Sequence, residues 1–225
     1  MMRGLHTPVR AIRRRVFKEV AQLGFKADAD TLLADMEAIP YAIVNEDSEK
    51  YRESVYRARA IVRERLRLAM GLSLRPENKP VHLTAGVEAS NISEKYYEPP
   101  LMQVIPSACE SCEENKYEVS NICKGCLAHP CQEVCPKDAI SMVNGRSYID
   151  QEKCIKCGKC KSVCPYDAIA KKERPCQKAC GVNAIKSDKM GRAYIDNKKC
   201  VSCGMCMVSC PFGCLLYTSP SPRDL

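Results

Sequence analysis

The cysteines are the residues of this sequence whose type and spacing most directly predict chemistry. All seventeen lie after residue 108, and two runs of them follow the pattern Cys-x2-Cys-x2-Cys-x3-Cys-Pro. The runs contain Cys154, Cys157, Cys160 and Cys164, and then Cys200, Cys203, Cys206 and Cys210. In such a run three closely spaced thiolates hold three corners of a 4Fe-4S cubane, and the fourth serves a different cluster. The spacing therefore predicts 4Fe-4S clusters that are shared between separate parts of the chain.

A third run, two residues longer, extends this pattern upstream. It contains Cys123, Cys126, Cys131 and Cys135, and a proline again follows the last cysteine. Exchanging the fourth ligands between runs predicts three clusters. Their ligand sets are Cys123, Cys126, Cys131 and Cys164; Cys154, Cys157, Cys160 and Cys135; and Cys200, Cys203, Cys206 and Cys180.

Four other cysteines remain outside these three sets. Cys176 and Cys210 belong to the last repeat, which lacks the two cysteines expected before Cys176. The upstream pair Cys109 and Cys112 has the missing spacing, and the chain could loop back to supply it. We predict that these four cysteines bind a fourth 4Fe-4S cluster.

Structural zinc is the main alternative interpretation of the Cys-x2-Cys pairs. Zinc sites use two such pairs separated by a spacer, which does not account for a third cysteine at the same spacing. His129 lies between Cys126 and Cys131 and could be a ligand, but four cysteines are already present. We favour His129 as a polar residue that tunes a nearby cluster. No residue is assigned a catalytic role.

The cysteine runs belong to a repeated unit. Residues 145–154 return in similar form as residues 191–200. Each copy places Ala-Ile, then Gly, then Tyr-Ile-Asp before its cysteines, an order that suits two short strands joined by a tight turn. Asn144-Gly145 is a strong signal for such a turn. The repetition predicts a duplicated supersecondary unit.

The first hundred residues contain no cysteine and must build an ordinary apolar core. The apolar spacing predicts a helix that begins at Pro8 and stops at Gly24. A short helix over residues 31–38 should end before the proline that follows. A longer helix is expected between a cap at Ser48 and a stop at Gly71.

The long helix also carries many arginines outside its apolar stripe. We interpret this surface as a solvated basic face with pairs such as Glu53–Arg57, and the alternative is a docking surface for an acidic partner or domain. The arginines are Arg52, Arg57, Arg59, Arg63, Arg65 and Arg67.

These patterns predict an α+β fold in which an N-terminal helical segment precedes duplicated modules that resemble bacterial ferredoxins. Residues 1–75 form the helical region and residues 76–108 a linker rich in proline. Residues 109–213 form the 4Fe-4S repeat region, with the clearest motifs at residues 145–174 and 191–213.

Charge and targeting signals limit the location and the partners. The formal charge is +8, but each oxidised 4Fe-4S core with its four thiolates carries about −2. The basic excess is therefore interpreted as a counter-charge for the clusters, and no nucleic-acid partner is expected. No secretory signal or membrane span is visible, so we expect a cytoplasmic protein whose thiols stay reduced.

The last twelve residues depart from the repeat. The repeat predicts Ala-Ile after Gly213, but the chain continues as Cys214-Leu-Leu-Tyr-Thr-Ser. This string resembles the in-frame translation of a transposase sequencing adapter. We predict that residues 214–225 are a non-native tail and omit Cys214 from the ligand sets.

Taken together, these motifs resemble the N-terminal region of monomeric iron-only (FeFe) hydrogenases of fermentative anaerobes. Many polyferredoxins share the cluster motifs, and the more particular stretches are residues 6–15, 49–76 and 96–106. The resemblance implies a fragment of an oxidoreductase whose ferredoxin-like region exchanges electrons with an external carrier such as ferredoxin. It also implies a fused catalytic domain with an H-cluster beyond residue 213.

The longer cysteine run also resembles that of the four-cluster electron-transfer subunits of molybdenum oxidoreductases. This second resemblance implies four clusters on one chain. It also implies the alternative function, an electron-transfer subunit or polyferredoxin docked to the catalyst of another redox complex.

Overall fold

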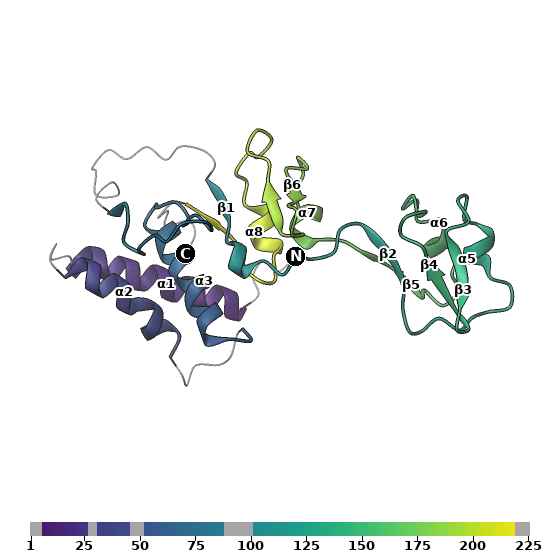
Figure 1. Ribbon diagram of the computed structural model, residues 1–225, viewed down its shortest axis with the longest axis horizontal. Helices are drawn as coiled ribbons and strands as arrows, with labels where there is room; N and C mark the ends of the chain where they lie inside the picture. Colours follow the sequence, from purple (N-terminus) through teal and green to yellow (C-terminus); the bar gives the residue numbers. More distant parts are fainter. Residues whose placement is uncertain (1–5, 27–30, 46–51, 88–100, 219–225) are drawn as a thin grey trace. The chain divides into compact units, whose positions relative to one another are not determined.

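The computed structural model of the chain describes residues 6–26, 31–45, 52–87 and 101–218 (Figure 1). Within these residues the fold combines helices with short two-stranded sheets, so the α+β class is confirmed. None of the described helices combines the length and apolar character that crossing a membrane requires.

The chain forms two compact units. Unit 1 contains Met1–Ser111 and Pro175–Leu225, and unit 2 contains Cys112–Arg174. Unit 2 is thus an insertion, in sequence, between two parts of unit 1. The boundaries of these two units differ from those of the helical region, linker and repeat region expected above. The division into those three regions stays a prediction.

Three helices of unit 1 pack around one apolar core: α1 (Pro8–Lys26), α2 (Leu32–Ile43) and α3 (Val55–Ala69) (Figure 1). The first begins as predicted, with the Thr7 hydroxyl accepting a hydrogen bond from the Arg10 N–H. The buried residues of this core are Val16, Phe17, Leu23, Met36, Ile39, Ile43, Val44, Ala58, Val62, Leu66, Ala69, Leu72, Leu83 and Val87.

Two predicted helix ends were wrong. Helix α1 continues past Gly24 to Lys26, because a single glycine costs a helix only about 1 kcal/mol. Helix α2 continues through Pro40, which lies inside it. Burial of Ile39, Pro40 and Ile43 against the core offsets the hydrogen bond that proline cannot donate.

Helix α3 carries the predicted apolar stripe, and its Ala58, Val62 and Leu66 are buried in the core. Its cap is Ser54, whose hydroxyl accepts a hydrogen bond from the Tyr56 N–H. The predicted cap Ser48 lies outside the described residues.

Unit 2 contains two antiparallel strand pairs and two single-turn helices. The Asn144-Gly145 turn is confirmed, since both residues have the positive φ that a two-residue hairpin needs. The pairs are β2 (Lys116–Val119) with β5 (Ile169–Lys172) and β3 (Ile140–Val143) with β4 (Arg146–Ile149), and the helices are α5 (Pro130–Glu133) and α6 (Lys159–Ser162).

The cysteine-rich part of unit 1 is built from similar elements. Its hairpin pairs Ile185 with Ile195, as the unit 2 hairpin pairs Ile140 with Ile149. The elements are β1 (Met102–Val104) with β8 (Leu215–Tyr217), β6 (Ile185–Ser187) with β7 (Ala193–Ile195), the 3-10 helix η1 (Pro106–Ala108), α7 (Pro175–Lys178) and α8 (Met205–Ser209).

Two segments are more ordered than the sequence suggested. The predicted linker contains β1 and η1. Part of the predicted tail also packs into unit 1, where the Cys214 carbonyl accepts a hydrogen bond from the Ile105 N–H at 2.7 Å. That residues 214–225 are non-native stays a prediction.

Candidate iron–sulfur sites

The first site lies in unit 2 and is called here the Cys157 cavity. Its walls include four cysteines, and the space between the atoms amounts to about 350 Å³. Tyr117, Ile140 and Ile149 close it on the apolar side. The cysteines are Cys135, which follows α5, Cys154 and Cys157, which lie in the loop before α6, and Cys160, which lies within α6. The structure thus brings together all four members of one predicted set.

A second cavity in unit 2, called here the Cys131 cavity, has nearly the same volume, about 330 Å³. Val119 and Ile169 contribute apolar surface, and Ser147 lies among the cysteines. The cysteines in its walls are Cys123, Cys126, Cys131 and Cys164. Each run therefore sends its last cysteine to the cavity formed by the other run, as the sequence predicted.

In unit 1 the predicted third set also comes together. The pKa of the Cys206 thiol is raised to about 11, mainly by burial, with smaller contributions from the neighbouring Cys200, Cys180 and Cys203. These contributions place the thiols of Cys180, Cys200 and Cys203 in the neighbourhood of Cys206. Four thiolates at such distances repel each other, and bound iron offsets that repulsion.

The structure gathers three of the four cysteines predicted for the fourth site. Cys109, Cys176 and Cys210 pack in the same apolar cluster of unit 1, whereas Cys112 is the first residue of unit 2. The Sγ atoms of Cys210 and Cys214 lie 3.3 Å apart. The hydrogen bond with Cys214 lowers the pKa of Cys210 to about 6.

Cys214 stands where the equivalent repeats have alanine. In those repeats the alanine N–H donates to the cysteine four residues earlier, as Ala139 does to Cys135 at 3.3 Å. Backbone N–H groups that donate to sulfur stabilise thiolate charge and tune a cluster's potential. The same contact joins Ala168 to Cys164 at 3.4 Å and Ala184 to Cys180 at 3.2 Å.

A recurrent backbone conformation marks the first Cys-x2-Cys pair of each cysteine group. The residue before the second cysteine of that pair has a positive φ, and so does the third residue after Cys135, Cys164, Cys180 and Cys210. Small polar residues and glycine tolerate this region best, a pattern that the sequence interpretation missed. The first group is Ser111, Gly125, Lys156 and Ser202, and the second is Asp138, Asp167, Asn183 and Gly213.

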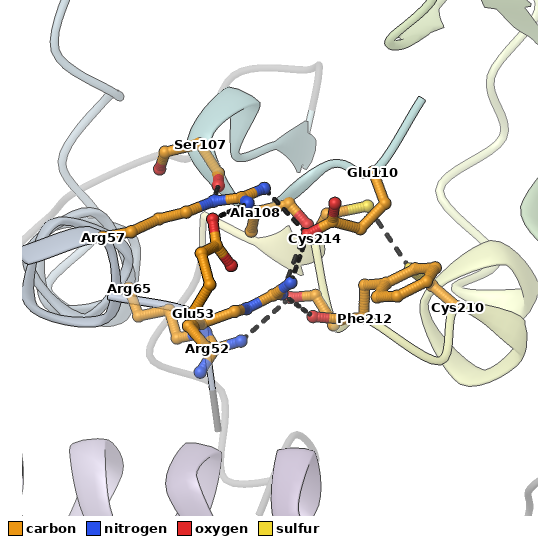
Figure 2. A network of polar contacts seen from close by, with 11 residues as sticks. Arg52, Glu53, Arg57, Arg65, Ser107, Ala108, Glu110, Cys210, Phe212 and Cys214 are labelled. Carbon is orange, nitrogen blue, oxygen red and sulfur yellow. Dashed lines mark hydrogen bonds and ion pairs between the residues drawn. The ribbon is translucent and has the colours of Figure 1, made fainter. Parts of the chain in front are cut away.

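The arginines of α3, with Arg52 just before the helix, do not form a solvated face, because several of them reach the loops beside the unit 1 cysteines (Figure 2). Arg52 pairs with Glu110 at 2.5 Å and donates to the Phe212 carbonyl at 2.8 Å. The fully buried Arg65 donates to the Gly213 carbonyl at 3.2 Å. The predicted Glu53–Arg57 pair is present, but this surface packs within unit 1 and is not solvated.

The remaining candidate ligand does not line either unit 2 cavity. His129 caps α5 with a left-handed backbone and is not among the residues that line the Cys131 cavity. Within the described part of the chain, no three His, Cys, Asp or Glu side chains form a group that could hold a metal ion by themselves.

Comparison with known proteins matches the cysteine-rich segments. A family model described as "LdpA Fe-S cluster-binding domain" matches residues 123–173, and one described as "4Fe-4S binding domain" matches residues 193–216. The chain is 43% identical over 53 residues to a 7Fe ferredoxin of Hydrogenibacillus schlegelii, and the match covers 24% of this chain and 68% of that protein. The chain belongs to the ferredoxin family.

Other relatives of this ferredoxin-family chain are matched over smaller shares of their length. An uncharacterized ferredoxin of Methanocaldococcus jannaschii is 33% identical, and the match covers 36% of this chain and 63% of that protein. The electron transport protein HydN of Escherichia coli is 37% identical, with 31% and 41% covered. The chain therefore spans less than two thirds of these two relatives.

The residues present in this ferredoxin-family chain fit 4Fe-4S clusters. Each unit 2 cavity offers four thiol donors and apolar walls, and backbone N–H groups point at Cys135 and Cys164. When bound, such clusters supply reversible one-electron transfer. The protein's part is to hold the thiolates, exclude water and place N–H donors around sulfur. The chain is an iron–sulfur electron-transfer protein.

A glycine pair tests how tightly the Cys131 cavity is built. In Gly125→Ala the new Cβ would overlap the backbone carbonyl oxygen of Gly145, at a residue whose φ is +56°. We expect a loss of about 3 kcal/mol of stability and faster thermal bleaching of cluster absorbance. Gly145→Ala is the matched control, because its φ is also positive but nothing lies within 4 Å of the added Cβ. It should cost only about 1 kcal/mol; equal losses in the two variants would contradict the packing.

Proposed function

We propose that this chain relays electrons through four 4Fe-4S clusters, between an external carrier such as ferredoxin and the catalytic domain of an iron-only hydrogenase. The observation that carries the relay is the pair of unit 2 cavities, each lined by four cysteines from both runs. The ligand sets are those predicted above, with Cys109, Cys112, Cys176 and Cys210 as the fourth. The assignment of a hydrogenase as the catalyst rests on residues 6–15, 49–76 and 96–106, which resemble the N-terminal region of iron-only hydrogenases.

The arrangement of the thiols supports transport of electrons rather than chemistry on a substrate. Cys131, Cys160, Cys176, Cys206 and Cys210 are buried, which keeps water away from the bound groups. No histidine replaces a cysteine in any proposed set, and we therefore expect low, ferredoxin-like potentials. The proposed setting is the cytoplasm of an anaerobe.

A second candidate is an electron-transfer subunit or polyferredoxin that docks to another catalyst. The similarity to the electron transport protein HydN of Escherichia coli favours it. The gene distinguishes the two candidates. The natural reading frame should continue beyond residue 213 into H-cluster motifs if the hydrogenase proposal is right, and a frame that stops soon after the last repeat would exclude it.

Iron content tests the relay. Anaerobic reconstitution should give about sixteen irons and sixteen acid-labile sulfides per chain, with brown colour and negative midpoint potentials. About twelve irons would exclude the fourth set and leave the others. A colourless protein that binds zinc in place of iron and sulfide would reject the proposed function.

A further inference from the structure

The two unit 2 cavities differ in how they meet solvent. All seventeen cysteines lie in the described part of the chain, and only Cys157 and Cys203 are exposed. Cys157 belongs to the first cavity, whereas every cysteine of the Cys131 cavity is buried or half-buried. One of the two sites therefore opens to solvent through a ligand.

The surface around Cys157 is positively charged. Lys137 and Lys159 line the Cys157 cavity and are exposed, and no acidic residue lines it. Lys156 lies between Cys154 and Cys157 and is exposed as well. Among the described residues no carboxylate lies within ion-pair distance of these three lysines. The Cys131 cavity has a single lysine, Lys124, in its walls.

An apolar residue completes this surface. The Ile155 side chain is 55% exposed beside Cys157 and also lines the cavity. An exposed apolar residue beside several lysines is typical of transient interfaces, in which charge speeds the encounter and apolar contact stabilises the complex. We call this surface, formed by Lys137, Ile155, Lys156, Cys157 and Lys159, the Cys157 rim.

We infer that the Cys157 rim is the docking surface for a soluble, acidic one-electron carrier protein. The inference rests on the proposed electron relay and deepens it by assigning the surface at which the carrier binds. Tunnelling weakens steeply with distance, so an exposed cysteine ligand is the natural point of close approach. Lysines that surround that ligand raise the encounter rate of a negatively charged partner.

The other exposed cysteine, Cys203, also has an exposed apolar neighbour, Val201, but its loop differs in charge. Between Cys200 and Cys210 the sequence contains no charged residue, whereas Lys156, Lys159 and Lys161 lie between Cys154 and Cys164. Lys198 and Lys199 are exposed just before Cys200, but the Cys203 loop itself carries no lysine, whereas the Cys157 loop carries three. The larger number of lysines near Cys157 favours the Cys157 rim as the binding surface for an acidic carrier.

Stopped-flow oxidation of a pre-reduced, strongly acidic small ferredoxin tests the inference on the full, cluster-loaded chain. The rim variant is Lys137→Glu with Lys159→Glu. The matched control is Lys18→Glu with Lys189→Glu, two exposed lysines in unit 1 whose reversal changes the net charge equally. At low ionic strength the rim variant should react about tenfold more slowly than the control, and the difference should shrink as salt is added.

Three measurements separate docking from other roles. Reduced methyl viologen, a small cation, should reduce both variants at least as fast as the unmodified chain, and iron content should be equal. Equal slowing of both variants by the ferredoxin would overturn the inference. So would a shifted midpoint potential that accounts for the slower rate, since the lysines would then tune the cluster. Failure of the unmodified chain to accept electrons from either donor would instead reject the proposed relay.

Discussion

Removing iron from the protein is expected to unfold unit 2 and to leave helices α1, α2 and α3 folded. The buried apolar cluster of unit 2 consists of Cys131, Cys160 and only four larger side chains. Those four are Tyr117, Ile140, Ile149 and Ile169. So small a core cannot offset the chain entropy of a unit this size, and the clusters must supply the remainder.

The helical part of unit 1, unlike unit 2, has an apolar core large enough to fold without iron. Its core contains no cysteine, and Met36, Val62, Leu66 and Ala69 within it have no exposed surface. Its stability therefore does not depend directly on metal. We expect an iron chelator under anaerobic, reducing conditions to remove the strand signals while much of the helical circular dichroism remains.

Hydrogen exchange measured by mass spectrometry locates the change. Peptides from β3 and β4 should lose protection in the iron-free protein, whereas peptides from α3 should keep it. Reconstitution with iron and sulfide is the control and should restore protection in β3 and β4. Persistent protection of those strands without iron would show that the apolar residues of unit 2 suffice.

Pairs of cysteine substitutions are expected to reveal the crossed ligation through iron counts. Cys135→Ala alone should remove one cluster, or about four irons. Adding Cys157→Ala should remove no more, because both thiols line the Cys157 cavity. Adding Cys126→Ala instead should remove a second cluster, about eight irons in total, since Cys126 lines the Cys131 cavity.

Non-additivity is what identifies a shared site in this experiment. Cys214→Ala is the control, because it restores the alanine found at the equivalent positions 139, 168 and 184, and it should cost no iron. If Cys135→Ala with Cys126→Ala lost only four irons, while Cys135→Ala with Cys157→Ala lost eight, each run would hold its own cluster. The crossed arrangement would then be wrong.

Local sequence signals predicted much of the fold. Thr7-Pro8 predicted the start of α1, and Asn144-Gly145 predicted the hairpin turn, because these residues act on their own backbone. The errors arose where burial outweighed local preference. Gly24 and Pro40 weaken a helix locally, yet α1 and α2 extend past them while packing apolar residues into a common core.

The burial and contacts of the arginines on the α3 surface could not be predicted from the sequence. The sequence predicted that its arginines form a solvated face, because a charged side chain on a helix is most often exposed. Arg65 and Arg67 are instead buried, and Arg57 donates to the carbonyl of Ser107, which is distant in the sequence. Only the packing of α3 against η1 and the loop at Phe212 decides which backbone carbonyls these guanidinium groups meet.

By itself the sequence determined the type of chemistry and the pairing of runs within unit 2, because cluster ligation depends on thiol spacing along a short stretch of chain. Tertiary structure alone decided that residues 112–174 separate from the rest as a unit, and that Cys109 lies with Cys176 and Cys210. It also decided which ligand meets solvent. Such relations join residues distant in sequence, and they depend on packing that no local pattern encodes.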